Sequence, residues 1–163
     1  MKRIIVSDTG PIITLEKLTN GFDFIRLIFD ELLIPPTVLI ELSQGQFRSG
    51  DEYLERFQVA NLIRIVECKE ISDLPDIHRL DQGEMESISL AYQMKLPLLI
   101  EETIGRQIAL NAGLKISGIA GQIIRANREG IIEKGDARMK LKELFDHGRI
   151  NRKIYSTLDQ SLK

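Results

Sequence analysis

The chain has 163 residues, 43% hydrophobic and 28% charged, which is typical of a globular protein with one core, so we predict a single domain over residues 1–163. The formal net charge of −2 excludes a protein that coats nucleic acid by bulk charge, but it is compatible with a nuclease whose metal-binding acids lower the total. No apolar run is long enough for a membrane span, and the single cysteine, Cys68, excludes an internal disulfide and a multi-cysteine zinc site.

The first predicted element is a short buried strand that ends in an acid. The β-branched run within Lys2–Ser7 predicts this strand, and Pro11 suits the first position of the helix that follows. Asp8 interrupts the apolar run too early for a secretory signal, so this segment and the lone cysteine favour a cytoplasmic protein. From the residue alone, Asp8 is either a cap of the helix or a functional carboxylate.

A second strand and helix place another acid on an apolar helix face. Glu31–Ile34 is predicted as a strand, and Pro36 begins a helix whose apolar face is defined by Val38 and Leu42. Glu41 lies on the same face, which is the kind of local exception expected at a functional site. The structural alternative is that Glu41 reaches solvent from the edge of this face or pairs with an arginine.

The next segment carries few signals of function. Asp51 is predicted to cap a helix over Glu52–Gln58, and Leu62–Cys68 is predicted to be a strand with Cys68 as an ordinary member. Lys69–Arg79 is expected to be irregular, since it contains a proline and no clear period.

The central stretch reads as helix, strand, acidic pair and helix. Its first helix begins near Asp81, has Glu84 in its first turn, and shows apolar residues at helical spacing, namely Met85, Ile88, Ala91 and Tyr92. A buried strand at Leu98–Ile100 follows, and Glu101 and Glu102 come directly off its end. Glu84 and the acidic pair are also favourable at helix N-termini for structural reasons alone.

The C-terminal part is predicted to be mainly helical. A strand at Lys115–Ile119 is followed by a helix over Ala120–Glu129, and two terminal helices are expected at Asp136–His147 and Asn151–Leu162 within a helical part spanning about 136–163. The terminal helices are rich in lysine and arginine, which indicates either a solvated helix face or a surface that faces RNA.

Strands and helices alternate throughout, which predicts an α/β fold with a mostly parallel central sheet and helices on both faces. Ligand sites in such sheets lie beyond the carboxyl ends of the strands, where Asp8, Glu101 and Glu102 are expected. We therefore expect these acids to meet Glu41 and Glu84 and to hold Mg²⁺ or Mn²⁺, which prefer oxygen ligands and relieve the repulsion between carboxylates.

Other chemistries lack their usual markers. The sequence contains neither a P-loop nor a GxGxxG motif, and His78 and His147 have no ligand-like spacing. An aspartyl-phosphate phosphatase would place a second aspartate two residues after Asp8, where this chain has Gly10.

Five segments carry a resemblance to a known family: VSDTGPIITLEKL, LLIPPTVLIEL, LDQGEMESISLA, LLIEETIGRQIALNAGLKISG and NREGIIEKG. On these segments, which span nearly the whole chain, it resembles the PIN-domain superfamily and, within it, the toxin-like group that carries the domain of unknown function DUF3368. The resemblance implies a Rossmann-like α/β/α sandwich and a metal-dependent ribonuclease, as in VapC toxins of toxin–antitoxin pairs. It also implies a small antitoxin partner and a homodimer.

The resemblance assigns the metal site residue by residue. Three family positions fall on Asp8, Glu41 and Glu84, and the fourth falls on the pair Glu101–Glu102, where the group usually has Asp-Asp and where Glu102 is the closer match. The longer side chains shift a carboxylate by about one methylene, so the alternative is a catalytically weakened module that binds RNA or a protein.

Two further residues are expected to act on the substrate side of this site. Arg106 falls on an arginine that is common in the group and is expected to contact phosphate or a neighbouring acid. Thr9, or alternatively Ser7, is expected to hydrogen-bond a ligand or a metal-bound water.

Overall fold

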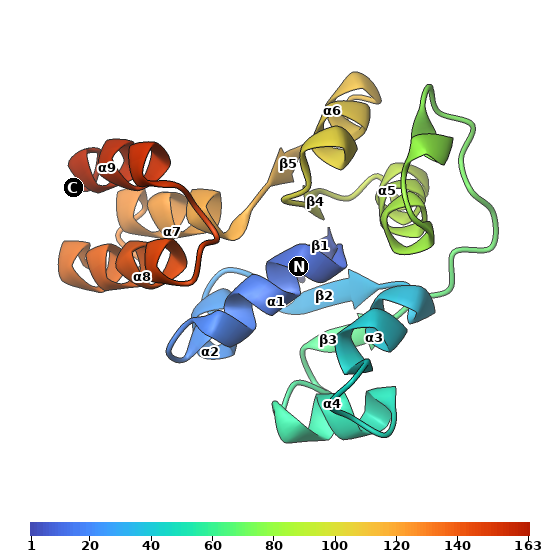
Figure 1. Ribbon diagram of the computed structural model, residues 1–163, viewed down its shortest axis with the longest axis horizontal. Helices are drawn as coiled ribbons and strands as arrows, with labels where there is room; N and C mark the ends of the chain where they lie inside the picture. Colours follow the sequence, from blue (N-terminus) through green and yellow to red (C-terminus); the bar gives the residue numbers. More distant parts are fainter.

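The central feature of the protein is a five-stranded sheet that is parallel throughout. The computed structural model describes residues 1–163, and Figure 1 shows its elements in chain order. The strands run in the order β3-β2-β1-β4-β5, with bounds β1 (Ile4–Ser7), β2 (Glu31–Ile34), β3 (Ile63–Ile65), β4 (Leu98–Leu99) and β5 (Ile116–Ser117). The predicted α/β class is confirmed, and the sheet that we expected to be mostly parallel has no antiparallel pair.

Nine α-helices surround the sheet. Their bounds are α1 (Thr9–Lys17), α2 (Gly21–Arg26), α3 (Pro36–Ser43), α4 (Gly50–Arg56), α5 (Gln82–Met94), α6 (Thr103–Asn111), α7 (Ile119–Arg128), α8 (Lys134–Asp146) and α9 (Arg152–Gln160). A single 3₁₀ turn at Ile77–Arg79 precedes α5. None of these helices combines the length and the apolar character that crossing a membrane requires.

The strands are buried on both faces because successive side chains alternate between two apolar clusters. Ile5 belongs to a cluster of 25 buried residues that includes residues of α1, α2, α3, α4, α7 and α8. Val6, the next residue, belongs to a cluster of 12 that includes residues of α5 and α6. Leu99 and Leu98 divide between the clusters in the same way. This period of two explains why the strands read as continuous apolar runs, and it makes the fold a three-layer sandwich.

Three predictions about individual elements are wrong. Ser49, not Asp51, caps α4: its side-chain oxygen accepts the backbone N–H of Glu52 at 3.2 Å, so the helix begins earlier than expected. Cys68 is not a strand residue, because β3 pairs with β2 and β2 ends before Pro35. Tyr92 is 45% exposed and lies outside the apolar face of α5.

The C-terminal helices pack as a unit against α1 and α7. Ala137, Leu141 and Leu144 of α8 join the larger core cluster. The ring of Phe145 stacks on Tyr155 of α9 at 5.1 Å. In Figure 1 these helices lie on the opposite side of the molecule from α5 and α6, with the carboxyl ends of β1 and β4 between the two groups.

Candidate metal centre

The carboxyl ends of β1 and β4 form the natural site of this fold. The chain places β2 and β3 on one side of β1 and β4 and β5 on the other, so the order of the sheet reverses between β1 and β4. Asp8 follows β1 directly, and its backbone N–H donates to the carbonyl of Leu99 in β4 at 3.0 Å. The acidic pair that follows β4 therefore comes off the same edge, where open α/β sheets bind ligands.

Asp8 is buried without a partner for one of its carboxylate oxygens. The residue is 5% exposed, and Oδ1 is fully buried with no hydrogen-bond partner. Asp8 occupies the N-cap position of α1, but its side chain makes no capping hydrogen bond, so capping does not account for this carboxylate. The pKa of Asp8 is raised to about 6. Burial is the largest cause, the N–H of Thr9 opposes the increase, and the like charges of Glu41 and other nearby acids contribute to it.

Glu41 is held against the first turns of α1 and α5. Its Oε2 accepts the hydroxyl of Thr9 at 2.5 Å. Its Oε1 lies so close to Gly83 that a Cβ at that position would collide with it, which explains the glycine at the start of α5. Burial raises the pKa of Glu41, the Thr9 hydroxyl opposes this effect, and the like charge of Asp81 adds to the increase.

Glu84 begins α5 as half of a reciprocal cap with Asp81. Asp81 Oδ1 accepts the backbone N–H of Glu84 at 2.9 Å, and Glu84 Oε1 accepts the N–H of Asp81 at 3.3 Å. The second oxygen, Oε2, is buried and has no partner. Burial, followed by the interactions with Asp81, raises the pKa of Glu84 to about 8, and the charge of Asp8 contributes.

Glu102 lies beside Glu84 but is occupied at the start of α6. Its carboxylate accepts the backbone N–H groups of Ile104, at 3.0 Å, and Gly105. Burial raises the pKa of Glu102, but these two donors outweigh it, so the pKa is lowered overall. A Cβ placed on Gly105 would lie 3.2 Å from Glu102 Oε2 and 3.6 Å from Glu84 Oε2, so both carboxylates face the same glycine.

Glu101 turns toward the C-terminal helices instead. Its Oε1 accepts the Thr14 hydroxyl at 2.7 Å, and its Oε2 accepts the backbone N–H of Ile119 at 2.9 Å. Arg149 Nη2 is 3.6 Å from Oε1. The structure thus places Glu41, Glu84 and Glu102 within range of the charge of Asp8, and it gives Glu101 a different set of neighbours.

The two residues expected on the substrate side lie at the same edge of the sheet. Thr9 hydrogen-bonds Glu41, so its hydroxyl orients one of the acids. Arg106 Nη1 donates to the carbonyl of Ile100 at 2.8 Å, which holds its guanidinium at the end of β4.

The sequence did not show that two further residues, Asp81 and Arg149, lie at this edge. Asp81 was recognised as a helix start but not as an acid that acts on its neighbours, although the three-residue spacing to Glu84 marks a capping box. The sequence places Arg149 only in the basic C-terminal part, and its contact with Thr14 could not be predicted because it joins residues 135 positions apart.

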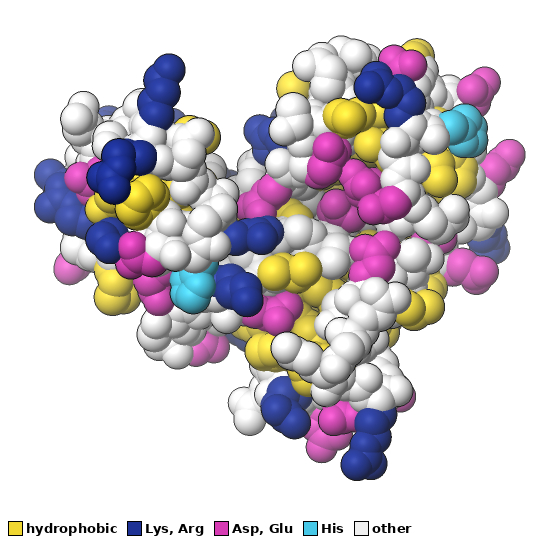
Figure 2. Space-filling model, viewed as in Figure 1, with side chains coloured by type: hydrophobic (Ala, Val, Ile, Leu, Met, Phe, Trp, Pro, Cys, Tyr) yellow, Lys and Arg dark blue, Asp and Glu magenta, His cyan; other side chains and the backbone are white.

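The acids fit a divalent cation in donor chemistry and in charge. Carboxylate oxygens suit Mg²⁺ and Mn²⁺, and the buried, unpartnered atoms Asp8 Oδ1 and Glu84 Oε2 are positions that a cation would satisfy. Acidic side chains gather in the middle of the face shown in Figure 2, with basic side chains beside them. No three His, Cys, Asp or Glu side chains are arranged as a ready ligand set, so binding would require Glu41 or Glu102 to turn from its present hydrogen bonds.

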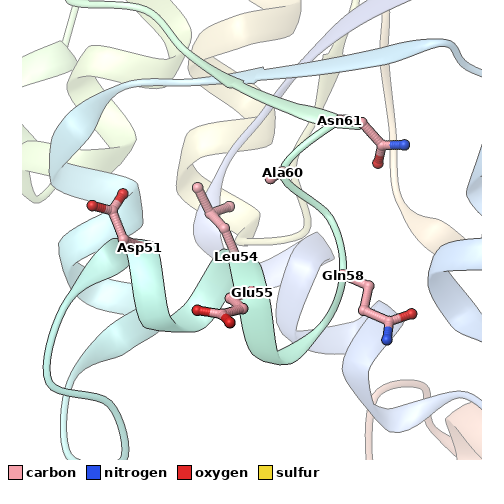
Figure 3. Close-up of a pocket in the computed structure, with 6 residues that line it drawn as sticks. All are labelled: Asp51, Leu54, Glu55, Gln58, Ala60 and Asn61. Carbon is pink, nitrogen blue, oxygen red and sulfur yellow. The ribbon is translucent and has the colours of Figure 1, made fainter.

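A separate pocket beside α4 lacks these features. Figure 3 shows its lining residues, which are Asp51, Leu54, Glu55, Gln58, Ala60 and Asn61. Asp51 and Glu55 are exposed, and neither carboxylate has a buried oxygen without a hydrogen-bond partner. We therefore place the candidate site at the acids and not in this pocket.

Comparison with known proteins points to one family. A family model described as DUF3368, a PIN domain, matches residues 4–163. No curated protein matches the chain. Among solved structures, a PilT N-terminus domain protein from the hyperthermophilic archaeon Sulfolobus solfataricus P2 is similar, with 16% identity, a TM-score of 0.49, and coverage of 71% of this chain and 87% of that one.

Proposed function

Because the chain belongs to the DUF3368 family of PIN domains, we propose that it is a metal-dependent endoribonuclease that works in the cytoplasm. PIN domains are generally nucleases and typically use divalent metal ions. The observation that carries the proposal is the buried carboxylate of Asp8, whose Oδ1 has no hydrogen-bond partner and lies among like charges, an arrangement that is unfavourable for the metal-free fold and favourable for a cation.

In this proposal, Asp8, Glu41, Glu84 and Glu102 hold Mg²⁺ or Mn²⁺. The ion would activate a water and offset the negative charge that develops on the phosphodiester. Thr9 orients Glu41 through its hydroxyl, and Asp81 orients Glu84 through the reciprocal cap. Arg106, whose guanidinium donates to the carbonyl of Ile100, would bind a phosphate of the substrate.

Metal binding and cleavage by an Asp8→Asn variant test the proposal. We expect the wild type to bind Mn²⁺ in a calorimetric titration and to cleave RNA with Mn²⁺ or Mg²⁺ but not in EDTA. Asp8→Asn should lower both the metal affinity and the cleavage rate by about 100-fold or more, since it removes a ligand. The matched control is Asp146→Asn, which removes the same charge from an exposed carboxylate on α8 and should change neither quantity. Cleavage that persists in EDTA and in Asp8→Asn would overturn the proposal.

A second candidate is a module that binds RNA or protein without cleaving it. The hydrogen bonds that occupy Glu102 and Glu41 favour this reading, because at least one of these side chains must turn to complete a ligand set. This second function predicts a chain that binds RNA or a protein but takes up no Mn²⁺ at millimolar concentration. Binding of Mn²⁺ that disappears in Glu84→Gln would instead support the nuclease.

The partners follow from the resemblance to VapC toxins. We propose that the chain forms a homodimer and is held inactive by a small antitoxin protein. The expected result is that the product of a short reading frame next to the gene co-purifies with the chain and suppresses its cleavage of RNA.

A further inference from the structure

Arg149 is a residue of the connection between α8 and α9 that lies on the first turns of α1. Its Nε donates to the Thr14 hydroxyl at 2.9 Å, and its Nη2 donates to the carbonyl of Gly10 at 3.2 Å. Gly10 is two residues after Asp8, so these bonds hold a guanidinium at the border of the acidic group. The Arg149 side chain is 30% exposed, which keeps one side of it open to solvent.

Glu101 is part of the same network. One of its oxygens binds Thr14, the other binds the N-terminus of α7, and Arg149 lies 3.6 Å away. Thr14 therefore accepts from Arg149 and donates to Glu101, and also approaches the carbonyl of Gly10. With both oxygens engaged on this side, the Glu101 carboxylate fixes an arginine and is not directed at the other acids.

The donors of Arg149 are only partly used. A guanidinium has five N–H groups in a planar fork, and the contacts with Thr14 and Gly10 use two of them. Nη1 has no partner within the protein. Such a fork, partly exposed and already oriented, suits a phosphate, which takes arginine as a bidentate ligand.

The negative charge of the acids explains why the positive charge of Arg149 would help RNA to bind beside them. The acids gathered at the end of β1 and β4 repel an RNA backbone, so an approaching strand needs positive charge next to them. We propose that Arg149 binds a phosphate of the RNA beside the metal site, and that Glu101 is a positioning residue that holds Arg149 and not a metal ligand. This inference rests on the proposed function for its substrate.

RNA binding without metal tests the role of Arg149. The affinity of the full chain for a fluorescent single-stranded RNA is measured in EDTA at several salt concentrations, for the wild type and for Arg149→Ala. We expect about tenfold weaker binding and a salt dependence whose slope falls by about 0.7, the value for one phosphate contact on a single strand. Arg64→Ala is the matched control, because it removes an exposed arginine from the edge strand β3, and it should change the affinity less than twofold.

The slope separates a phosphate contact from a folding defect. Arg149→Lys keeps the charge and loses the fork, so it should retain the wild-type slope and bind with intermediate affinity. If Arg149→Ala binds RNA like Arg64→Ala, or with an unchanged slope, the proposed contact is wrong.

Metal and RNA binding together test the role of Glu101. Glu101→Gln should leave the affinity for Mn²⁺ within about twofold of wild type, while Glu102→Gln should weaken it by about tenfold or more. Glu101→Ala should weaken RNA binding in the wild type and should not weaken it further in Arg149→Ala, because it acts through that residue. Equal losses of Mn²⁺ affinity in the two Gln variants, or a further loss of RNA affinity in the double variant, would overturn this role.

The two proposals fail in different ways. The EDTA experiment does not require bound metal, so a wild type that binds RNA through Arg149 but takes up no Mn²⁺ would reject the nuclease and keep the RNA contact. If the wild type binds Mn²⁺ and cleaves RNA, and Arg149→Ala binds and cleaves RNA equally well, the nuclease is kept and the RNA contact of Arg149 is rejected.

Discussion

At Asp8, the feature that suits a metal ion, a buried negative charge, lowers the stability of the metal-free protein. A buried carboxylate with one unpartnered oxygen opposes folding at neutral pH, because the N–H of Thr9 replaces only part of the hydration that the charged form loses. Its pKa is raised to about 6, above the ordinary value of 3.8. Below pH 3.8 the contribution of the neutral carboxyl to stability is fully present, and it is lost as the pH rises through about 6.

We therefore predict that Asp8→Asn stabilises the metal-free protein at neutral pH while it removes the proposed function. The free energy of unfolding should rise by about 2 kcal/mol at pH 7, since each unit of pKa shift corresponds to about 1.4 kcal/mol and the buried amide offsets part of the gain. The measurement is urea denaturation in EDTA. At pH 4, where Asp8 is largely protonated in the native state, the difference should nearly vanish. A variant that is less stable than wild type at pH 7 would contradict this prediction.

At the scale of elements, the close approach of α3 and α5 is what turns two separate acids into one group. Glu41 comes from α3 and Glu84 from α5, and Gly83 is the position where the two helices meet. Glycine is unfavourable inside a helix by about 1 kcal/mol relative to alanine, and at Gly83 it leaves room for the Glu41 carboxylate against the first turn of α5.

We predict that Gly83→Ala displaces Glu41 and weakens Mn²⁺ binding by about tenfold, with little net change in stability, because improved helix propensity offsets the displacement. The control is Gly121→Ala in α7, where a new Cβ would lie 3.8 Å from Ser117 in ordinary contact. That variant should gain about 0.5–1 kcal/mol in urea denaturation and keep its Mn²⁺ affinity. Calorimetric titration of both variants with Mn²⁺ tests this prediction. Equal Mn²⁺ affinities in Gly83→Ala and Gly121→Ala would contradict it, because they would mean that the new methyl group at position 83 does not disturb Glu41.

How well each element could be predicted depends on whether its cause is local. Glu31–Ile34 is a strand over its predicted bounds, because its apolar run ends at Pro35. The end of β3 could not be read in this way, since it depends on where its partner β2 stops. The direction of Glu101 could not be predicted either, because it depends on Thr14 and Arg149, which are far away in the sequence.

At the scale of the whole molecule, the order of the sheet explains why the acids meet. Alternating strands and helices predict a parallel sheet, and parallel strands put their carboxyl ends on one edge. That argument brings Asp8 and the acidic pair to the same edge, but the placement of β4 next to β1 is a tertiary fact that the sequence pattern does not contain. Glu84 reaches this edge because α5 begins beside it, and Glu41, near the end of α3, faces Gly83 in the first turn of α5.

This arrangement predicts that a cation stabilises the whole protein in a pH-dependent manner. The raised pKa values, about 6 for Asp8 and about 8 for Glu84, mean that the metal-free native state binds more protons than the unfolded chain up to these values. Its stability should therefore fall as the pH rises toward 8. A cation binds the deprotonated acids and competes with these protons, so its affinity rises over the same range.

The increase in melting temperature caused by 1 mM Mn²⁺ should accordingly be small at pH 5 and grow to several degrees by pH 8, following the ratio of metal concentration to dissociation constant. Differential scanning calorimetry of the wild type across this range measures it, with Asp8→Asn as the variant in which the increase should be absent. Because the acids come from separate elements of the fold, we expect Mn²⁺ to raise the melting temperature of the whole protein and not only of a local loop. An increase that is independent of pH, or equal in the variant, would mean that Mn²⁺ binds elsewhere on the surface.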